Sequence, residues 1–289
     1  ARIGHPVTWL GRLILVLDAR LNDPRRSVAQ RQLLGGIATL LAVAAAALPA
    51  ALVQTALPGG AAGAILAGVL AWPLVAARSL HEHVAAVAAP LGRGDVAGAR
   101  RAVAMIVGRD PERLDAAGIA RAATESLAEN ASDGIVAPLF WGAVGGLPGI
   151  AAYKAINTLD SMIGHRTPRH EAFGAVAARV DDVANLVPAR LTGLLFALAS
   201  GRPRAVIRVM RRDAPHHRSP NAGWPEAAMA AALGVRLSGP RVYSDRVAEE
   251  PWLNAAAPDP DAAALARGLA LYLRALLLLA LGLALAAVI

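Results

Sequence analysis

Hydrophobic and polar positions divide the chain into long apolar runs separated by charged segments. Residues 32–77 contain no charged side chain, and this stretch is long enough for two helical crossings of a hydrocarbon layer about 30 Å thick. Pro49 and the turn residues 58–60 interrupt it. We therefore expect two membrane spans, near 33–57 and 61–79.

Three further apolar segments follow. Residues 275–289 are uncharged, and extending this run back across Arg274 predicts a span near 268–289 with the arginine at the membrane interface. Residues 135–152 and 183–199 are shorter and are broken by proline and glycine. Broken segments are tolerated at membrane depth when they are buried in protein or line a cavity. We expect these two to be partial or buried segments that line a polar cavity.

Two polar segments lie between the apolar ones. In 80–134 apolar residues recur at helical spacing, with a break near Pro90 and Asp95 placed to cap the next helix. Residues 201–264 are proline-rich with little periodicity and are expected to form a loop. The pattern predicts an all-α, polytopic integral membrane protein with cytoplasmic helices and loops, forming a single domain over 1–289.

Composition supports a membrane protein. Of 289 residues, 56% are hydrophobic and only 17% are charged, and the mean hydropathy is +0.46, which is unusual for a soluble domain. The net charge of +8 comes from dispersed arginines that are not interleaved with aromatic residues, so we expect no nucleic-acid partner. Arginines flank the first two spans, including Arg109, and place both flanks in the cytoplasm. Without cysteine, disulfides and thiolate metal sites are excluded.

The first candidate cluster is acidic. Glu125, Glu129 and Asp133 are spaced i, i+4, i+8, which places three carboxylates on one side of a helix, with Asn130 adjacent. Like charges at this spacing repel unless a cation sits among them. We favour Mg²⁺ binding over a solvated acidic face that ends in a cap at Gly134.

The second cluster contains Lys154, the only lysine in an arginine-rich chain. On a helix Lys154, Asn157 and Ser161 share a face, and Asp160 lies beside Asn157. A lysine paired with Asp160 at the interface is the plain alternative. An ammonium that contacts phosphate as a point charge is harder to replace by a planar guanidinium, which favours a functional lysine.

The third cluster surrounds the start of the second broken segment. Asp181, Asp182 and Asn185 can crowd one helical face and present oxygen ligands to a hard cation. Helix capping with a salt bridge to Arg179 or Arg190 is the alternative.

The fourth cluster is the irregular segment 211–234, which enters a helix at Pro225 with Glu226 just behind. Glu226 either acts in the site or favours the helix dipole. The segment concentrates donors suited to an anion: His216, His217, Arg218, Ser219 and Asn221. Adjacent histidines lack the spacing of a helical zinc pair, so zinc is the weaker interpretation.

The chain contains no P-loop, Rossmann, nucleophile-elbow or H-E-x-x-H motif. It instead resembles the CobD/CbiB family, the adenosylcobinamide-phosphate synthases of cobalamin biosynthesis, and the resemblance runs from His5 nearly to the last span. The stretches that carry it are SLHEHVAAV (79–87), GRDPERLDAAGIARAATESLAENASDGIVAPLFW (108–141), GGLPGIAAYKAINTLDSMIGHRTPRHEAFG (145–174), ARVDDVANLVPARLT (178–192) and RRDAPHHRSPNAGWPEAAMAAALGVRLSGP (211–240).

The resemblance implies an enzyme of the cell (inner) membrane. It would join adenosylcobyric acid to an amino-alcohol phosphate, such as (R)-1-amino-2-propanol phosphate, with hydrolysis of ATP and a requirement for Mg²⁺. Other late enzymes of the pathway are expected partners in the membrane. Candidate catalytic residues are Glu125, Glu129, Asp133, Lys154 and Asp160. Candidate metal ligands are Glu125, Glu129, Asp160, Asp181 and Asp182. Candidate substrate-binding residues are Asn130, Asn157, Arg179, Asn185, Arg190, His216, Arg218, Ser219, Asn221 and Glu226. Glu129 is the candidate base for the substrate ammonium.

Two departures from the family pattern stand out. The family usually opens with an apolar segment bearing L-D-x-x-x-G-D-P, whereas this sequence starts at the following H-P-V. Ala131 occupies a position where an aromatic is expected.

Two rival functions remain from the sequence: an intramembrane Mg²⁺-dependent prenyltransferase, and a non-catalytic corrinoid-binding or transport protein. One active site cannot straddle a bilayer. We therefore expect the four clusters to converge on one cavity that opens to the cytoplasm.

Overall fold

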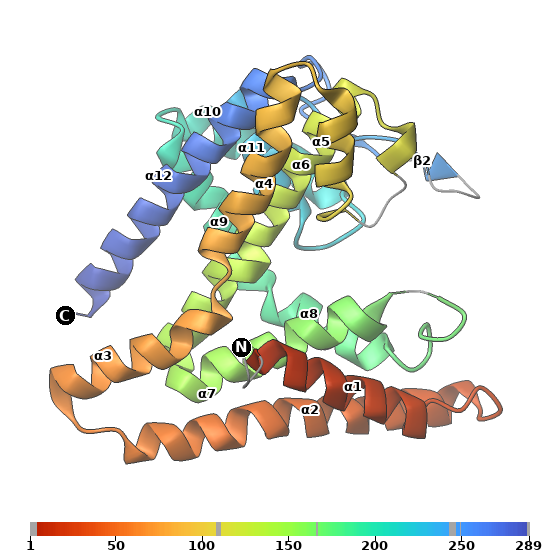
Figure 1. Cartoon of the computed structure of the whole chain (residues 1–289), viewed down its shortest axis with the longest axis vertical. Coiled ribbons are helices and arrows are strands. Elements are labelled where there is room, and N and C mark those ends of the chain that lie inside the picture. The colour runs from red at the N-terminus through yellow and green to blue at the C-terminus, as the bar shows by residue number, and fades with distance from the viewer. Residues whose placement is uncertain (1–4, 108–110, 166, 243–246, 249, 288–289) are drawn as a thin grey trace. The chain divides into compact units, whose positions relative to one another are not determined.

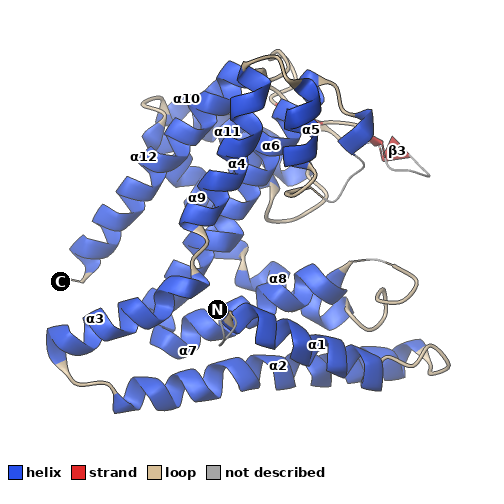
Figure 2. Ribbon diagram, in the orientation of Figure 1, coloured by secondary structure: helices blue, strands red, loops and turns tan. Residues whose placement is uncertain are grey.

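The computed structural model describes residues 5–107, 111–165, 167–242, 247–248 and 250–287, and these are mostly helical (Figures 1 and 2). The predicted all-α class is confirmed. Arg109 lies outside the described residues. The chain forms two compact units, unit 1 (Ala1–Val75 with Ala137–Asn185) and unit 2 (Ala76–Val136 with Leu186–Ile289). The single domain expected over 1–289 stays a prediction.

Unit 1 is a helical bundle. Its elements are α1 (Pro6–Leu21), α2 (Val28–Ala56), α3 (Gly60–Ala71), the 3₁₀ turn η1 (Trp72–Leu74), α7 (Ala137–Leu159), the π-helical turn η4 (Asp160–Gly164) and α8 (Ala175–Ala184). Helix α2 starts at a capping box, in which the Ser27 side chain accepts from Gln30 N and the Gln30 side chain accepts from Ser27 N. The helix packs most extensively against α7.

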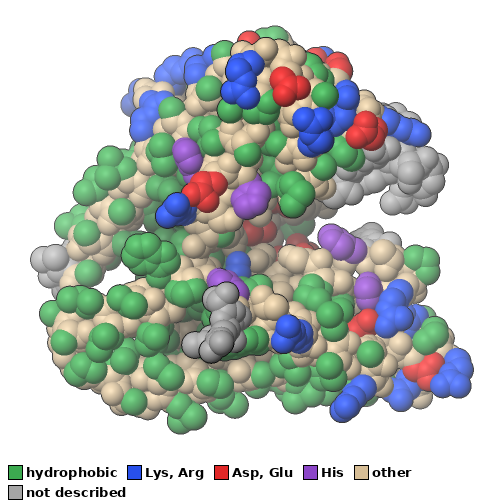
Figure 3. All heavy atoms as spheres, viewed as in Figure 1, with side chains coloured by type: hydrophobic (Ala, Val, Ile, Leu, Met, Phe, Trp, Pro, Cys, Tyr) green, Lys and Arg blue, Asp and Glu red, His purple; other side chains and the backbone are tan. Residues whose placement is uncertain are grey.

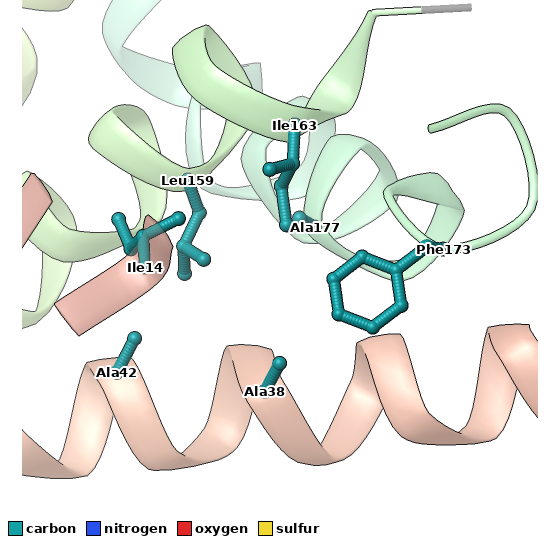
Figure 4. Close-up of a cluster of buried hydrophobic side chains, with 7 residues drawn as sticks. All are labelled: Ile14, Ala38, Ala42, Leu159, Ile163, Phe173 and Ala177. Atoms are coloured by element: carbon teal, nitrogen blue, oxygen red, sulfur yellow. The ribbon is translucent and has the colours of Figure 1, made fainter. Parts of the chain in front are cut away.

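The core of unit 1 lies over α2. In Figure 4 Ala38 and Ala42 point from α2 toward larger side chains, and the cluster consists of Ile14, Ala38, Ala42, Leu159, Ile163, Phe173 and Ala177. A Cβ at Gly35 would overlap the Phe173 carbonyl. Small residues on α2 therefore let its neighbours approach closely, as is common between membrane helices.

Helix α7 is broken at Gly146, which has φ 62° and ψ −149°. Only glycine adopts this conformation readily. The break exposes the backbone N–H of Leu147, which donates to Gln54 Oε1 at 2.6 Å. A polar side chain in the apolar helix α2 thus satisfies the group that the break would leave without a partner.

Unit 2 surrounds α6. Its helices are α4 (Ala77–Gly92), α5 (Val96–Val103), η2 (Pro111–Arg113), α6 (Ala116–Ala131), the π-helical turn η3 (Ser132–Val136), α9 (Leu186–Ala199), α10 (Pro203–Asp213), η5 (Ala214–His216), α11 (Gly223–Leu233) and α12 (Ala262–Ala286). Most of α6 is buried, and α4, α11 and α12 pack against it. Asp95 caps α5 by accepting from Gly98 N at 2.8 Å, as predicted. Helix α4 continues through Pro90 and ends at Gly92.

The prediction of a loop over 201–264 is wrong. This segment contains α10 and α11, together with two short antiparallel pairs: β1 (Leu237–Ser238) with β4 (Trp252–Leu253), and β2 (Arg241–Val242) with β3 (Val247–Ala248). In α10 the two apolar residues that pack inward are Val206 and Met210, with exposed Arg208 between them and further arginines on either side. The high arginine content obscured their i, i+4 spacing.

Four helical runs in the described chain are long and apolar enough to cross a membrane: Val28–Ala56, Gly60–Gly92, Ala116–Gly164 and Ala262–Ala286. Together, α8 and α9 form a further candidate that is interrupted at Asn185. Large apolar side chains are exposed along α2 and α3 (Figure 3), including Leu40, Leu52 and Ile65. Such a surface is expected to contact lipid. The predicted membrane protein is confirmed, and the helices extend beyond the predicted spans at several ends.

Candidate functional site

The predicted site residues fall in both units. Lys154, Asn157, Asp160, Arg179, Asp181, Asp182 and Asn185 lie in unit 1, and the others lie in unit 2. The expected convergence of the four clusters on one cavity stays a prediction.

The three carboxylates of α6 and η3 differ in environment. Glu125 is buried, Glu129 is exposed and Asp133 is half-buried. Helix α6 is capped at Ser132, and Asp133 and Gly134 both lie inside the π-helical turn. The regular helical face assumed for all three carboxylates therefore ends before Asp133, and Gly134 is not the helix cap.

Glu125 connects α6 to the first strand. Its Oε1 accepts a hydrogen bond of 2.8 Å from Ser238 N, and Ser238 has the positive φ of 60° that is uncommon for a residue other than glycine. The Ser238 hydroxyl donates to Glu250 Oε2 at 3.4 Å, and Glu250 also pairs with Arg218, 3.3 Å from Arg218 Nε. Ser238 and Glu250 were missed in the sequence because nothing near them is periodic or repeated.

The segment after α10 is fixed by its own side chains. The Ser219 hydroxyl accepts from Asn221 N and Ala222 N, at 3.2 and 3.1 Å. The imidazole of His217 is buried, and its Nε2 lies 3.8 Å from Glu226 Oε2, which is also buried. Exposed His216 binds only the Arg212 carbonyl, through Nδ1 at 3.1 Å, among the described residues.

Arg190 is held beside the same segment. Its guanidinium lies over the Trp224 ring, 4.4 Å from the centroid. Its Nη1 donates to the Leu186 carbonyl at 2.7 Å and approaches Asn221 Oδ1 at 3.4 Å. Arg190 therefore lies beside Trp224 and Asn221, and Asn221 in turn donates through its backbone N–H to Ser219.

In unit 1 a buried hydrogen-bonded chain runs from α7 to α8. The Tyr153 hydroxyl donates to Asn185 Oδ1 and Asn185 Nδ2 donates to Asp181 Oδ2, each at 2.9 Å. Tyr153 and Asn185 are both 1% exposed. The predicted pairing of Asp181 with Asn185 is confirmed. Tyr153 was missed, although it directly precedes Lys154.

The remaining site residues of unit 1 lie in the last turns of α7, in η4 and on α8. Lys154, Asn157, Asp160 and Asp182 are half-buried, and Arg179 is exposed. Asp160 opens the π-helical turn η4, and the side chains of His165 and Asp182 are the charged groups near enough to act on its carboxylate. The Ser161 hydroxyl donates to the Asn157 carbonyl at 2.8 Å, so Ser161 is engaged by the backbone.

The arrangement of carboxylates bears on how Mg²⁺ could be held. In the described part of the chain, no group of three or more His, Asp or Glu side chains is placed to hold a metal ion. Mg²⁺ in nucleotide sites is usually held by one or two carboxylates, while phosphates and water complete its octahedron. Two carboxylates of like charge within electrostatic range, Asp160 and Asp182, are compatible with this open mode.

Comparison with known proteins gives a consistent result. The model of the family described as "CobD/Cbib protein" matches residues 1–272. The "Cobalamin biosynthesis protein CobD" of Rhodobacter capsulatus is 65% identical over 275 residues, covering 95% of this chain and 87% of that protein. The proteins of the same name from Brucella suis and Rhizobium meliloti are 53% and 48% identical over 261 residues each, covering 88% of this chain and 80% of theirs. No solved structure matches.

Proposed function

Because the chain belongs to the CobD/CbiB family of cobalamin biosynthesis proteins, we propose that it is an ATP- and Mg²⁺-dependent amide-forming synthase. It joins adenosylcobyric acid to an amino-alcohol phosphate, such as (R)-1-amino-2-propanol phosphate, and yields adenosylcobinamide phosphate. The family match over nearly the whole chain is the observation that carries this proposal. Acidic and amide side chains where α7 and α8 end support it.

The chemistry requires an activated carboxylate. Transfer of the γ-phosphoryl group of ATP to the corrinoid carboxylate gives an acyl phosphate and ADP. The amine then attacks the acyl carbon, inorganic phosphate leaves, and the amide remains. Positioning and charge neutralisation are the main tasks of the protein in the first step.

We assign the triphosphate to the residues of unit 1. Asp160 and Asp182 would hold Mg²⁺, which neutralises phosphate charge when it is bound. Lys154 would contact a phosphate as a point charge, with Asn157 on the same helix as an orienting group. Arg179, exposed on α8, is a further candidate anion contact. The hydrogen bonds from Tyr153 to Asn185 and from Asn185 to Asp181 orient the Asp181 carboxylate, which is next to Asp182 in the sequence.

The residues of unit 2 receive different assignments. Glu129, which is exposed, remains the candidate base that removes the proton from the substrate ammonium. Asp133 and the group of Arg190, Ser219 and Asn221 remain candidate substrate contacts. Glu125 receives a positioning role in place of a metal-binding one, because its Oε1 already binds Ser238 N.

His216, Arg218 and Glu226 remain weaker candidates. Arg218 pairs with Glu250, Glu226 is buried beside His217, and His216 points its Nδ1 toward a backbone carbonyl. We further propose that the enzyme lies in the inner membrane with its site open to cytoplasmic ATP, near other late enzymes of the pathway.

The test is reconstitution. The purified protein is placed in lipid nanodiscs and supplied with adenosylcobyric acid, the amino-alcohol phosphate, ATP and Mg²⁺. Mass spectrometry should detect adenosylcobinamide phosphate together with ADP, and omission of either ATP or Mg²⁺ should abolish it. Asp182→Asn should raise the Mg²⁺ concentration needed for half-maximal rate.

Turnover of a prenyl diphosphate would support the prenyltransferase instead. Corrinoid binding without product formation under any nucleotide condition would support a carrier. Either result would overturn the proposed synthase.

A further inference from the structure

Unit 2 contains a pocket of about 430 Å³ that none of the assignments above explains as a whole. It lies among α4, α6 and the segment that follows α5. Its polar lining residues are Ser79, His83, Ser126 and Asn130, and its apolar wall includes Met105 and Ile106. None of the described residues that line it is charged. Among these described lining residues, a triphosphate or an amino-alcohol phosphate would meet no Lys or Arg side chain.

The tautomer of a neutral His83 imidazole follows from its contacts. Its Nδ1 lies 2.7 Å from the Ser79 carbonyl oxygen, and a carbonyl oxygen can only accept a hydrogen bond. Nδ1 therefore carries the proton, and Nε2 of the neutral imidazole is an acceptor. Within the described chain, no partner meets His83 Nε2.

Asn130 presents a second acceptor. Its Nδ2 donates to the Ser126 carbonyl at 2.9 Å and to the Ser126 hydroxyl at 3.2 Å, which uses both N–H bonds. The Ser126 hydroxyl in turn donates to the Ile106 carbonyl at 3.2 Å. Asn130 Oδ1 meets no partner among the described residues.

We propose that this pocket receives the edge of the corrinoid, through its primary carboxamide side chains. A carboxamide NH₂ group donates two hydrogen bonds, which matches the two acceptors, His83 Nε2 and Asn130 Oδ1. The apolar wall formed by Met105 and Ile106 suits the hydrocarbon parts of the macrocycle, and the uncharged lining suits a neutral group. This inference rests on the proposed function and names the substrate that the pocket takes.

Binding without turnover tests it. Equilibrium dialysis in nanodiscs, with ATP omitted and corrinoid absorbance as the readout, compares cobyric acid with cobyrinic acid, in which carboxylates replace the side-chain amides. The wild-type protein should prefer cobyric acid. His83→Asn keeps a donor for the Ser79 carbonyl and removes the Nε2 acceptor, so it should weaken cobyric acid binding roughly 2- to 10-fold. His81→Asn, on the same helix but outside the pocket lining, is the matched control.

Asn130→Leu gives a second perturbation, which should also reduce the preference for the amide form. If both variants bind both corrinoids like the wild type while the wild type still makes product, the pocket assignment is wrong and the proposed function stands. If His83→Asn raises the KM for the amino-alcohol phosphate and leaves corrinoid binding unchanged, the pocket belongs to the amine, and the assignment is again overturned. A wild-type protein that makes no product under any condition would instead refute the proposed function.

Discussion

Tyr153→Phe removes one hydroxyl from the buried chain that orients Asp181. The hydroxyl donates to Asn185 Oδ1 at 2.9 Å, and Asn185 in turn donates to Asp181 Oδ2 at 2.9 Å. The change adds no volume and leaves the ring in its core cluster with Ala137 and Ala184. Its effect should therefore come from the hydrogen bond.

The expected magnitude follows from burial. Asn185 is 1% exposed, so its acceptor would lose the Tyr153 donor in a place with little access to water. Leaving a buried acceptor without its donor costs about 1–3 kcal/mol, and each kcal/mol lowers the melting temperature of a 150–250-residue domain by roughly 2–4 °C. Because Asn185 would then hold Asp181 less firmly, kcat for amide formation should fall about tenfold.

Tyr272→Phe is the matched control. Its hydroxyl donates to the Ala77 carbonyl at 2.8 Å, and the side chain is as well buried, but it belongs to unit 2, whereas the proposed Mg²⁺ pair belongs to unit 1. Thermal unfolding should show similar losses for both variants, whereas steady-state assays should show a loss of kcat for Tyr153→Phe alone. If both variants lowered kcat equally, or if Tyr153→Phe left kcat unchanged, the hydrogen bonds from Tyr153 through Asn185 would have no positioning role.

Four further predictions concern single side chains. Gln54→Leu should lower the melting temperature in nanodiscs by several degrees, because the buried Leu147 N–H loses its acceptor, at a cost of about 1–3 kcal/mol in stability. The control Gln32→Leu, on the same helix, should leave the melting temperature unchanged. Lys154→Arg should lower kcat or raise the KM for ATP or the amino-alcohol phosphate, and unchanged values for all three would show that the lysine is idle. Gly164→Ala would push a Cβ into the Asp160 carboxylate, so the Mg²⁺ requirement measured by titration should rise more than in Gly36→Ala, where a Cβ meets only ordinary contacts with Val176. Hydrogen bonding from Arg236 lowers the pKa of Asp259, against the opposing effect of burial. The stability that this carboxylate contributes is therefore fully present above its unfolded pKa of about 4 and is lost as the pH falls through the lower folded pKa. When unfolding is measured as a function of pH, the wild type should lose its stability advantage over Asp259→Asn only below about pH 4.

Local chemistry made much of the fold predictable. A charge-free stretch fixes where α2 and α3 lie because lipid excludes unpaired charges. Asp95 predicts the start of α5 because an aspartate side chain satisfies an N–H group that the first turn cannot. The acid and amide pair Asp181 and Asn185 also follows from spacing within one helix.

Contacts between distant segments were not predictable in this way. Gln54 and Leu147 are 93 residues apart, and Glu125 and Ser238 are 113 residues apart. In each case a polar side chain accepts a hydrogen bond from a backbone N–H at an irregular position. For Leu147 the irregularity is the break in α7, and for Ser238 it is the positive φ. A single sequence indicates such a backbone irregularity only weakly, and it does not show which distant side chain accepts the hydrogen bond.

The π-helical turns explain why regular spacing failed at the acidic residues. Asp133 lies inside η3, and Asp160 is the first residue of η4, so both carboxylates sit where the backbone departs from 3.6 residues per turn. At η4 the space for the Asp160 carboxylate depends on Gly164, whose missing Cβ would otherwise occupy it. Such turns cost regular hydrogen bonding and are often found at functional sites. The position of Asp160 thus depends on a glycine four residues later as much as on its own place in the helix, so a test of its proposed Mg²⁺ role can be made at Gly164 without changing the carboxylate.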